Sequence, residues 1–355
     1  MSTENVRVRL KRSPGIVCYW EDDQLIYHNY LTGVRITASP LCAAILNLFD
    51  GRRRCGELFD ALHGFSRQSL KRILEQLVNL SFLVEENPNS RSRRLEELSS
   101  WSPIATFYHL ATKDMKYRVR LGQSPQTVHS YLRAHPQPPF FKRHPGAKIV
   151  VLPSVELPKE GSFVDVLLRR RTWREFSKDG MDLQTLSRLL YLSWGVTDYL
   201  KVKFLGRLPL KTSPSAGARH PIEVYVVPLR IEGLPQGIYH YSSDRHHLEC
   251  LRLGPMKRHV IRYLGGQNWF QDAAAVFFMT AVFSRVYWKY RYPRAYRTVL
   301  LDAGHVCQTF CLTATWLGLA PFCTAALADT LIEKALGVDG IRESVVYVAG
   351  VGNLP

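Results

Sequence analysis

Lys289 and Tyr290 are adjacent in the sequence, just ahead of a stretch with helical spacing. An ammonium group beside a phenol can lower the pKa of one of the two groups, which then accepts a proton near neutral pH. The pair is therefore a candidate for acid–base catalysis. Beyond the pair, five residues recur at steps of three or four and predict one face of a helix over 294–317: Arg294, Arg297, Leu301, His305 and Gln308. A lone histidine such as His305 is more often structural than catalytic.

A basic cluster with the sequence RRRTWR occupies residues 169–174, where an expected helix ends and an irregular turn begins. Its guanidinium groups and the Thr172 hydroxyl could converge on one phosphate, because arginine donates paired hydrogen bonds to phosphate oxygens. A run of charge is usually only a solvated face. The cluster therefore gains meaning only from what lies around it.

A loop of small residues bounded by prolines, SPSAGARHP, covers residues 213–221 and precedes an expected strand. Small side chains let a backbone approach a flat ligand closely, and the Ser215 hydroxyl could bond to a ligand carbonyl or hydroxyl group. An ordinary tight loop is the alternative interpretation.

The elements that would position these groups alternate helices and strands from about residue 161 onward. This order is typical of an α+β or α/β domain with a central sheet. The stretch 273–283 is apolar on both faces, so we expect it to be a buried central strand. The expected helices cover 162–170, 182–195, 255–264 and 294–317, and the other expected strands cover 222–229, 237–241 and 344–350.

Residues 1–86 have a different pattern, which is winged-helix-like. The expected elements are a hairpin over 15–30, helices over 40–49, 55–63 and 66–80, and a strand over 82–84. DNA binding is one interpretation, but the third helix offers few phosphate partners and carries Glu75 among them. Residues 87–160 are expected to be a connector with a helix near 103–116, a strand at 149–152 and a proline-rich segment.

The composition is that of an ordinary globular protein of 355 residues. The net charge of +17 favours anionic partners of any kind, so it does not choose among nucleic acid, peptide and cofactor. The N-terminus has no apolar signal segment, and the longest uncharged apolar stretch is shorter than the roughly 20 residues of a membrane span. We therefore expect a cytoplasmic protein with no membrane partner.

The seven cysteines form an odd set without a CxxC pair, which indicates neither a disulfide framework nor a zinc site. Cys307 and Cys311 have the i, i+4 spacing of a helix and could hold a metal, but we interpret them as small core residues. No metal is expected.

Three motifs together resemble the SagB/ThcOx/McbC group of nitroreductase-like flavoenzymes. They are RRTWR at 170–174, PSAGA at 214–218, and KYRYPRAYR at 289–297 followed by LDAGHVCQ at 301–308. The resemblance implies an α+β, nitroreductase-like FMN-binding fold over 161–355, with a central mixed sheet flanked by helices in a domain-crossed homodimer. Residues 1–86 are similar in kind to the PqqD-like domains, which bind a leader peptide as an added strand.

The resemblance also implies roles for individual residues. Lys289 and Tyr290 match the catalytic pair of azoline oxidases, and Arg174 would lie near the flavin N1 edge. The residues implied to bind FMN are Arg170, Arg171, Thr172 and Arg174, then Pro214, Ser215, Ala216 and Gly217 from the other subunit, with Gln267 and, after a turn at 321–323, Thr324 and Ala325 as weaker assignments. Two positions depart from the pattern, since Asn353 stands where many members have arginine and His220 stands where an aromatic residue is usual.

The implied reaction is the oxidation of thiazoline or oxazoline rings in a ribosomally made peptide, with a precursor peptide and a cyclodehydratase as partners. Lys289 or Tyr290 would take the proton while the flavin takes the hydride. One alternative keeps the fold and changes the substrate to another peptide or nonribosomal intermediate, or to a nitro or quinone compound. A second alternative is a non-catalytic protein that binds a leader peptide or DNA.

Overall fold

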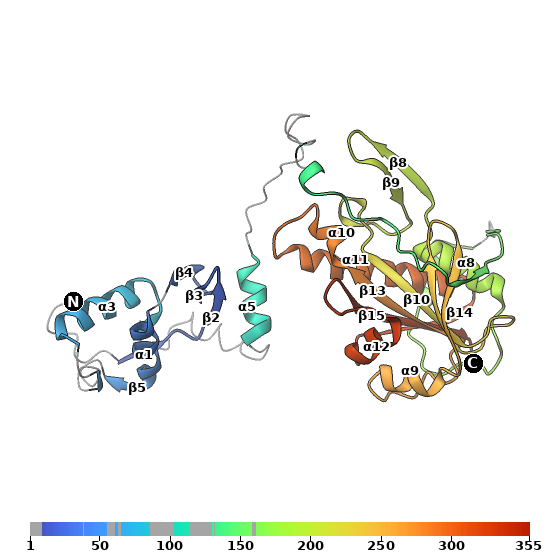
Figure 1. Cartoon of the computed structure of the whole chain (residues 1–355). Helices are drawn as coiled ribbons and strands as arrows, with labels where there is room; N and C mark the ends of the chain where they lie inside the picture. Colours follow the sequence, from blue (N-terminus) through green and yellow to red (C-terminus); the bar gives the residue numbers. More distant parts are fainter. Residues whose placement is uncertain are drawn as a thin grey trace. The chain divides into compact units, whose positions relative to one another are not determined.

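The chain divides into two compact units, Met1–Lys116 and Tyr117–Pro355. They are coloured blue to cyan and green to red in the computed structural model of Figure 1. The structure describes residues 9–37, 39–54, 61–62, 65–85, 103–113, 130, 132–157 and 161–355. The segment expected to be a connector, 87–160, is shared between the units, because its helix belongs to the first and its strand to the second.

The first unit has two three-stranded sheets and three described helices. Leu70, Leu74 and Leu77 form the buried stripe of α3, whose first turn is capped by the side chain of Ser66. The expected hairpin, first and third helices and last strand are present, whereas the helix expected over 55–63 lies mostly outside the described residues. The elements are β1 (Arg9–Arg12), β2 (Ile16–Glu21), β3 (Gln24–Asn29), β4 (Val34–Thr37), α1 (Pro40–Leu48), β5 (Asp50–Arg54), α3 (Arg67–Asn79), β6 (Leu83–Glu85) and α5 (Pro103–Ala111).

The second unit is built on a seven-stranded sheet in the order β14-β15-β13-β10-β11-β12-β7. The apolar stretch expected to be central is β13, which lies inside the sheet between β15 and β10. The strands are β7 (Lys148–Val151), β10 (Ile222–Pro228), β11 (Gly237–Ser242), β12 (His247–Leu253), β13 (Ala275–Val282), β14 (Leu319–Thr324) and β15 (Glu343–Asn353).

The pairings of this sheet differ from the mixed pattern that was expected, because all six are antiparallel. β13 and β14 run in the same direction, as two strands joined by a long helix should, but β15 is inserted between them and pairs with both. The expected turn at 321–323 was also wrong, since Pro321, Phe322 and Cys323 belong to β14. Proline is tolerated there because β14 is an edge strand.

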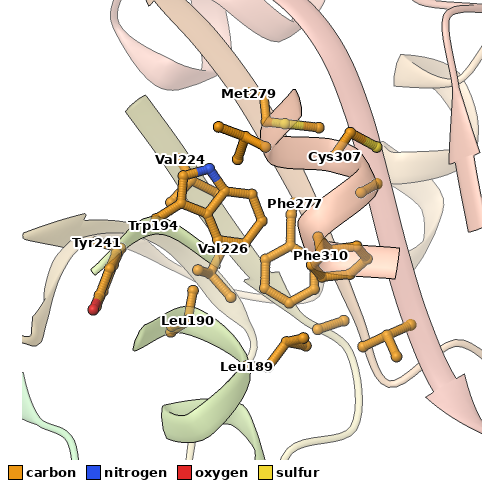
Figure 2. Packing of buried hydrophobic residues seen from close by; sticks show 14 of the residues in the cluster. Leu189, Leu190, Trp194, Val224, Val226, Tyr241, Phe277, Met279, Cys307 and Phe310 are labelled. Carbon is orange, nitrogen blue, oxygen red and sulfur yellow. The ribbon is translucent and has the colours of Figure 1, made fainter. Parts of the chain in front are cut away.

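Helices cover both faces of the sheet (Figure 1). One face packs on α8 (Leu183–Trp194) and α11 (Ala295–Trp316), where Trp194 stacks on Phe277 with ring centroids 5.8 Å apart and Phe310 fills the space beside them (Figure 2). The other face packs on α9 (Lys257–Tyr263) and α12 (Asp329–Leu336). Close packing on both sides fixes the strand ends that carry the site.

The unit also contains the hairpin β8 (Asp198–Val202) and β9 (Gly206–Leu210), the helices α7 (Phe163–Arg169) and α10 (Phe283–Tyr287), and a short 3₁₀ helix, η2 (Ala216–Ala218), inside the 213–221 loop. The hairpin, α10, α12, β12 and β14 were not expected from the sequence. Within the described part of the chain, no helix is both long and apolar enough to cross a membrane.

Gly350 offers a direct test of how tightly the sheet is packed. A Cβ atom at this position would lie 2.0 Å from the ring of Phe322, which is fully buried. We expect Gly350→Ala to lower the free energy of unfolding by roughly 1–3 kcal/mol through overpacking. Urea unfolding of Gly350→Ala alone and in a Phe322→Leu background measures this, and the smaller ring-free side chain should relieve most of the added cost. An equal cost in both backgrounds would contradict the packing described.

Candidate active site

The loop at 213–217 is held to α11 by a buried hydrogen bond. The Ser215 hydroxyl donates to Asp302 Oδ2 over 2.5 Å, and the backbone N–H of His220 donates to Ser215 Oγ over 2.8 Å. Asp302 is only 3% exposed, so this bond forms away from bulk water. The Ser215 side chain, expected to face a ligand, is therefore engaged in shaping its own loop.

Gly217 brings this loop against Lys289 and Tyr290. A Cβ atom on Gly217 would lie 2.6 Å from Lys289 Nζ and 2.8 Å from Tyr290 Oη. The backbone of Gly217 has φ +61°, in the left-handed region that favours glycine. Two motifs that lie more than 70 residues apart in the sequence thus form one group, and only glycine permits the contact.

Arg219 is the buried cation of this group, and the sequence analysis did not include it among the site residues. Its guanidinium carbon lies 4.7 Å from the Phe140 ring centre and 5.1 Å from that of Trp288, and its Nε donates to the Gly217 carbonyl over 3.0 Å. The side chain is 1% exposed, and Nη2 has no hydrogen-bond partner among the described residues. Its position inside the SPSAGARHP loop could have identified Arg219 as a candidate site residue from the sequence.

The electrostatics of the group separate Lys289 from Tyr290. Burial lowers the pKa of Lys289, and the positive charge of Arg219 lowers it further. Burial raises the pKa of Tyr290; the charge of Arg219 opposes this rise and that of Asp302 adds to it. Lys289 is therefore the member of the pair whose pKa moves toward that of a proton acceptor at neutral pH, while Tyr290 remains a protonated phenol.

A second group gathers where α7 ends beside β14. The Trp173 N–H donates to the Pro321 carbonyl over 3.0 Å, which places the basic turn along the edge strand. The guanidinium of Arg174 lies 5.8 Å from the ring centre of Trp269, and Trp269 Nε1 donates to Gln267 Oε1 over 3.0 Å. Arg174 and Gln267 thus meet at Trp269, a residue that the sequence analysis did not single out.

The remaining predicted cofactor residues lie around this second group. Arg170 acts electrostatically on the thiol of Cys323 in β14, whereas Arg171 donates to the carbonyl groups of Leu168 and Arg170 at its own helix end. Thr324 ends β14, and its Oγ1 accepts from the Ala326 N–H. The other predicted residues are exposed: Thr172, Arg174 and Ala325. Exposed guanidinium groups and a hydroxyl form a donor set that suits a phosphate.

The two departures from the family pattern are both engaged locally. Asn353 Nδ2 donates to the carbonyl groups of Asp179 and Gly180 over 3.3 and 3.0 Å. Burial, together with the nearby charge of Lys211, lowers the pKa of His220 to about 3. His220 is therefore neutral, and its Nε2 lies 3.0 Å from the Pro209 carbonyl, to which it donates.

The two groups lie at opposite ends of the sheet. Pro321 is in the same row as Val351 and Ala275, whereas Ile222, which follows the 213–221 loop, is paired with Ala281. Six residue steps along β13 separate these rows, or about 20 Å at strand geometry. Within one chain, Arg174 and Gly217 therefore do not surround a common ligand ring.

The family of the chain follows from its sequence matches. The pattern of the nitroreductase family matches residues 167–353, just over half of the chain. The chain belongs to the nitroreductase family. The nitroreductase-named protein MJ1384 of Methanocaldococcus jannaschii is 31% identical over 189 residues, which cover 53% of this chain and 89% of that protein.

Two further similar proteins align with only part of their own length. The trifolitoxin-processing protein TfxB of Rhizobium leguminosarum bv. trifolii is 30% identical over 170 residues, which are 47% of this chain and 46% of TfxB. A nitroreductase-named crystal structure from Anabaena variabilis has a TM-score of 0.55 at 20% identity and covers 71% of this chain and 47% of that one. The chain thus spans less than half of TfxB and of the Anabaena protein, and the latter supports the fold alone.

Asp302 gives the site a measurable pH dependence. Burial raises the pKa of Asp302 above its value in the unfolded chain. The wild-type free energy of unfolding therefore falls as the pH rises from the unfolded-state pKa through the raised pKa of the folded state. Asp302→Asn removes this titration and still offers an oxygen to Ser215. We expect the free energy of unfolding of Asp302→Asn, relative to wild type, to increase as the pH rises from about 4. Urea unfolding between acidic and neutral pH measures the difference, and a constant or shrinking difference would argue against a buried carboxylate.

Proposed function

We propose that this nitroreductase-family flavin oxidoreductase uses FMN to oxidise thiazoline or oxazoline rings in a ribosomally made peptide. One observation carries the proposal: the backbone of Gly217 lies against Lys289 and Tyr290, so a proton acceptor stands beside a loop that can approach a flat ligand. Simple nitro reduction requires few acid–base groups from the protein. The similarity to TfxB, a trifolitoxin-processing protein, favours a peptide substrate.

The reaction removes a hydride and a proton from adjacent carbons of the azoline ring and leaves an aromatic ring. FMN, when bound, supplies the acceptor for the hydride. Burial and the charge of Arg219 lower the pKa of Lys289, which increases the fraction of neutral amine; this neutral amine would take the proton and become an ammonium group. Tyr290 keeps its proton and offers a hydroxyl donor beside the base. Arg219 then favours the loss of the proton from Lys289, because the two positive charges repel each other.

The residues proposed to hold FMN fit its chemistry in two parts. Arg170, Thr172 and Arg174 provide donors for the phosphate and for the electron-rich edge of the ring, and Gln267 lies beside Arg174 through Trp269. The loop Pro214–Gly217 provides a close backbone approach. Thr324 and Ala325 continue from β14 toward the same region as Arg170, whereas Arg171 is already bonded to its own helix end.

The separation of these two parts is the reason for proposing a homodimer. Because about 20 Å of strand separates the rows of Pro321 and Ile222 in one chain, a second copy must supply one of the parts if both are to surround one flavin ring. The second unit exposes large apolar side chains suited to such an interface: Phe163 and Leu168 on α7, Leu301 on α11, and Ile341.

The first unit is proposed to recognise the precursor peptide, and a cyclodehydratase is proposed to make the azoline rings that the chain oxidises. A cavity of about 460 Å³ opens in this unit between β1, β2 and α1, with Lys11, Arg12, Tyr27 and Tyr30 among its lining residues. Cationic and aromatic side chains together suit an acidic or amphipathic leader segment. The alternative of nucleic acid binding has no comparable support from the described residues.

Variants of the Lys–Tyr pair test the catalytic proposal. We expect Lys289→Ala to keep the flavin but lower turnover of an azoline-containing peptide by about 10²–10⁴-fold, the range for loss of a general base. Tyr290→Phe should lower turnover less, because it removes a donor and leaves the base. The measurement is product formation by mass spectrometry, with bound flavin followed by its visible absorbance.

Lys257→Ala is the matched control, since Lys257 is an exposed lysine on α9 that only approaches Asp272 at 3.9 Å. It should behave as wild type. Full turnover by Lys289→Ala with flavin bound would refute the assigned base. Absence of flavin in the wild-type protein would instead refute the cofactor.

A further inference from the structure

A cluster of polar side chains occupies part of the sheet face that elsewhere packs on α9 and α12. His240 in β11 and Glu249 in β12 are direct cross-strand partners, and His144 lies in the turn just before β7. One ligand atom from each of these three residues lies within 4.8 Å of the others. His240 and Glu249 are 1% and 3% exposed, so the cluster is inside the protein.

A carboxylate already orients the central histidine. His240 Nε2 lies 2.9 Å from Glu223 Oε2, and His240 Nδ1 lies 2.8 Å from Glu249 Oε2. Glu223 is itself fixed by Arg285, which donates from Nη2 over 2.5 Å. A histidine that donates one ring N–H to a fixed carboxylate presents its other nitrogen in a defined direction, which is the usual arrangement around a metal-bound imidazole.

Two nitrogen atoms beside Glu249 are buried without a hydrogen-bond partner among the described residues. They are His144 Nε2 and His247 Nε2, and His247 Nε2 lies 3.7 Å from Glu249 Oε1. Burial lowers the pKa of His144, and the charges of His240 and Lys142 lower it further. Buried polar atoms normally have a partner.

We propose that His144, His240 and Glu249 bind a divalent transition-metal ion of the zinc type. Two imidazole nitrogens and a carboxylate are a ligand set that zinc accepts, and tetrahedral ligands at about 2.0–2.1 Å from the ion lie about 3.3 Å apart. His240 Nδ1 and Glu249 Oε2 are already 2.8 Å apart, and the ligand atom of His144 lies within 4.8 Å of those of the other two residues. His247 stands close enough to Glu249 to support the same carboxylate.

The two ring nitrogens of His240 would then have separate partners. Nδ1 would bind the ion beside Glu249, while Nε2–H would continue to donate to Glu223.

A second group with metal-ligand chemistry, Cys307, Cys311 and Cys323, is less suited. Cys307 and Cys311 are part of the apolar core between α11 and the sheet, and the Tyr347 hydroxyl already donates to Cys323 over 3.2 Å. No orphaned nitrogen or oxygen points to a ligand there among the described side chains. This group fits core packing, as the sequence analysis expected for the two helical cysteines.

The proposed ion would anchor the segment that reaches the active site. Lys142 donates to Glu343 and Arg143 pairs with Asp244, each over 2.5 Å, and His144 would add a metal bond to these contacts. Phe140, four residues earlier, lies over the guanidinium of Arg219. The ion would thus have a structural role, because it would hold the segment that places the Phe140 ring against Arg219.

The test is zinc binding by the full-length, flavin-containing protein after treatment with a chelator. We expect one zinc ion per chain by calorimetry and elemental analysis, and a zinc X-ray absorption spectrum with nitrogen and oxygen at about 2.0–2.1 Å and no sulfur at about 2.3 Å. His144→Gln should weaken binding by about 10–100-fold or more. Cys323→Ser and His259→Gln are the controls and should bind as wild type.

The spectrum of the wild-type protein decides the ligands even if His144→Gln fails to fold. A sulfur shell, or loss of zinc in Cys323→Ser, would assign the metal to the cysteine group and overturn the proposal. No binding of micromolar zinc by wild type would overturn it as well, with water as the partner of the buried nitrogens. Neither outcome affects the proposed oxidation, because the Lys289 variants are scored by turnover and not by zinc.

Discussion

The buried hydrogen bond between Ser215 and Asp302 is the constraint on which the site depends. It ties a loop of small residues to the middle of α11, and α11 is in turn locked to the sheet by Phe310 and its neighbours. With the loop held there, Gly217 can lie against Lys289 and Tyr290 at a distance that no side chain would allow. The bond thus brings the 213–221 loop and the Lys289–Tyr290 pair, which are distant in the sequence, into one site.

Charged side chains are also buried at this end of the sheet. Arg219 is enclosed by Phe140 and Trp288, and Arg285 joins Glu223 to the carbonyl groups of His220 and Pro139. A buried charged side chain that donates to a backbone carbonyl group fixes the position of the segment to which that carbonyl belongs. Both faces of the sheet also carry an apolar core, one on the side of α8 and α11 and the other on the side of α9 and α12.

Much of this could be predicted from local pattern, because α11, β13 and the basic turn at 169–174 are encoded by residues close in sequence. The contacts that define the site could not. The pairing of His240 with Glu249 depends on the register of β11 and β12. The approach of Gly217 to Lys289 depends on the pairing of the start of β10 with the end of β13. Pro321 suggested a turn, because proline is rare in strands, and only the edge position of β14 accommodates it. Ser215 was expected to face a ligand. Nothing in the sequence indicated that its hydroxyl would instead bond to Asp302, which lies 87 residues further along the chain.

The central claim is that the flavin site is divided between two copies of the chain, with the residues around Arg174 from one and those around Lys289 from the other. Mixing two inactive variants, Arg174→Gln and Lys289→Ala, after they are unfolded and refolded together tests it most directly. Half of the dimers would then be mixed, and each would contain one intact site, so the account predicts about a quarter of wild-type turnover. Turnover no higher than that of either variant alone would contradict it.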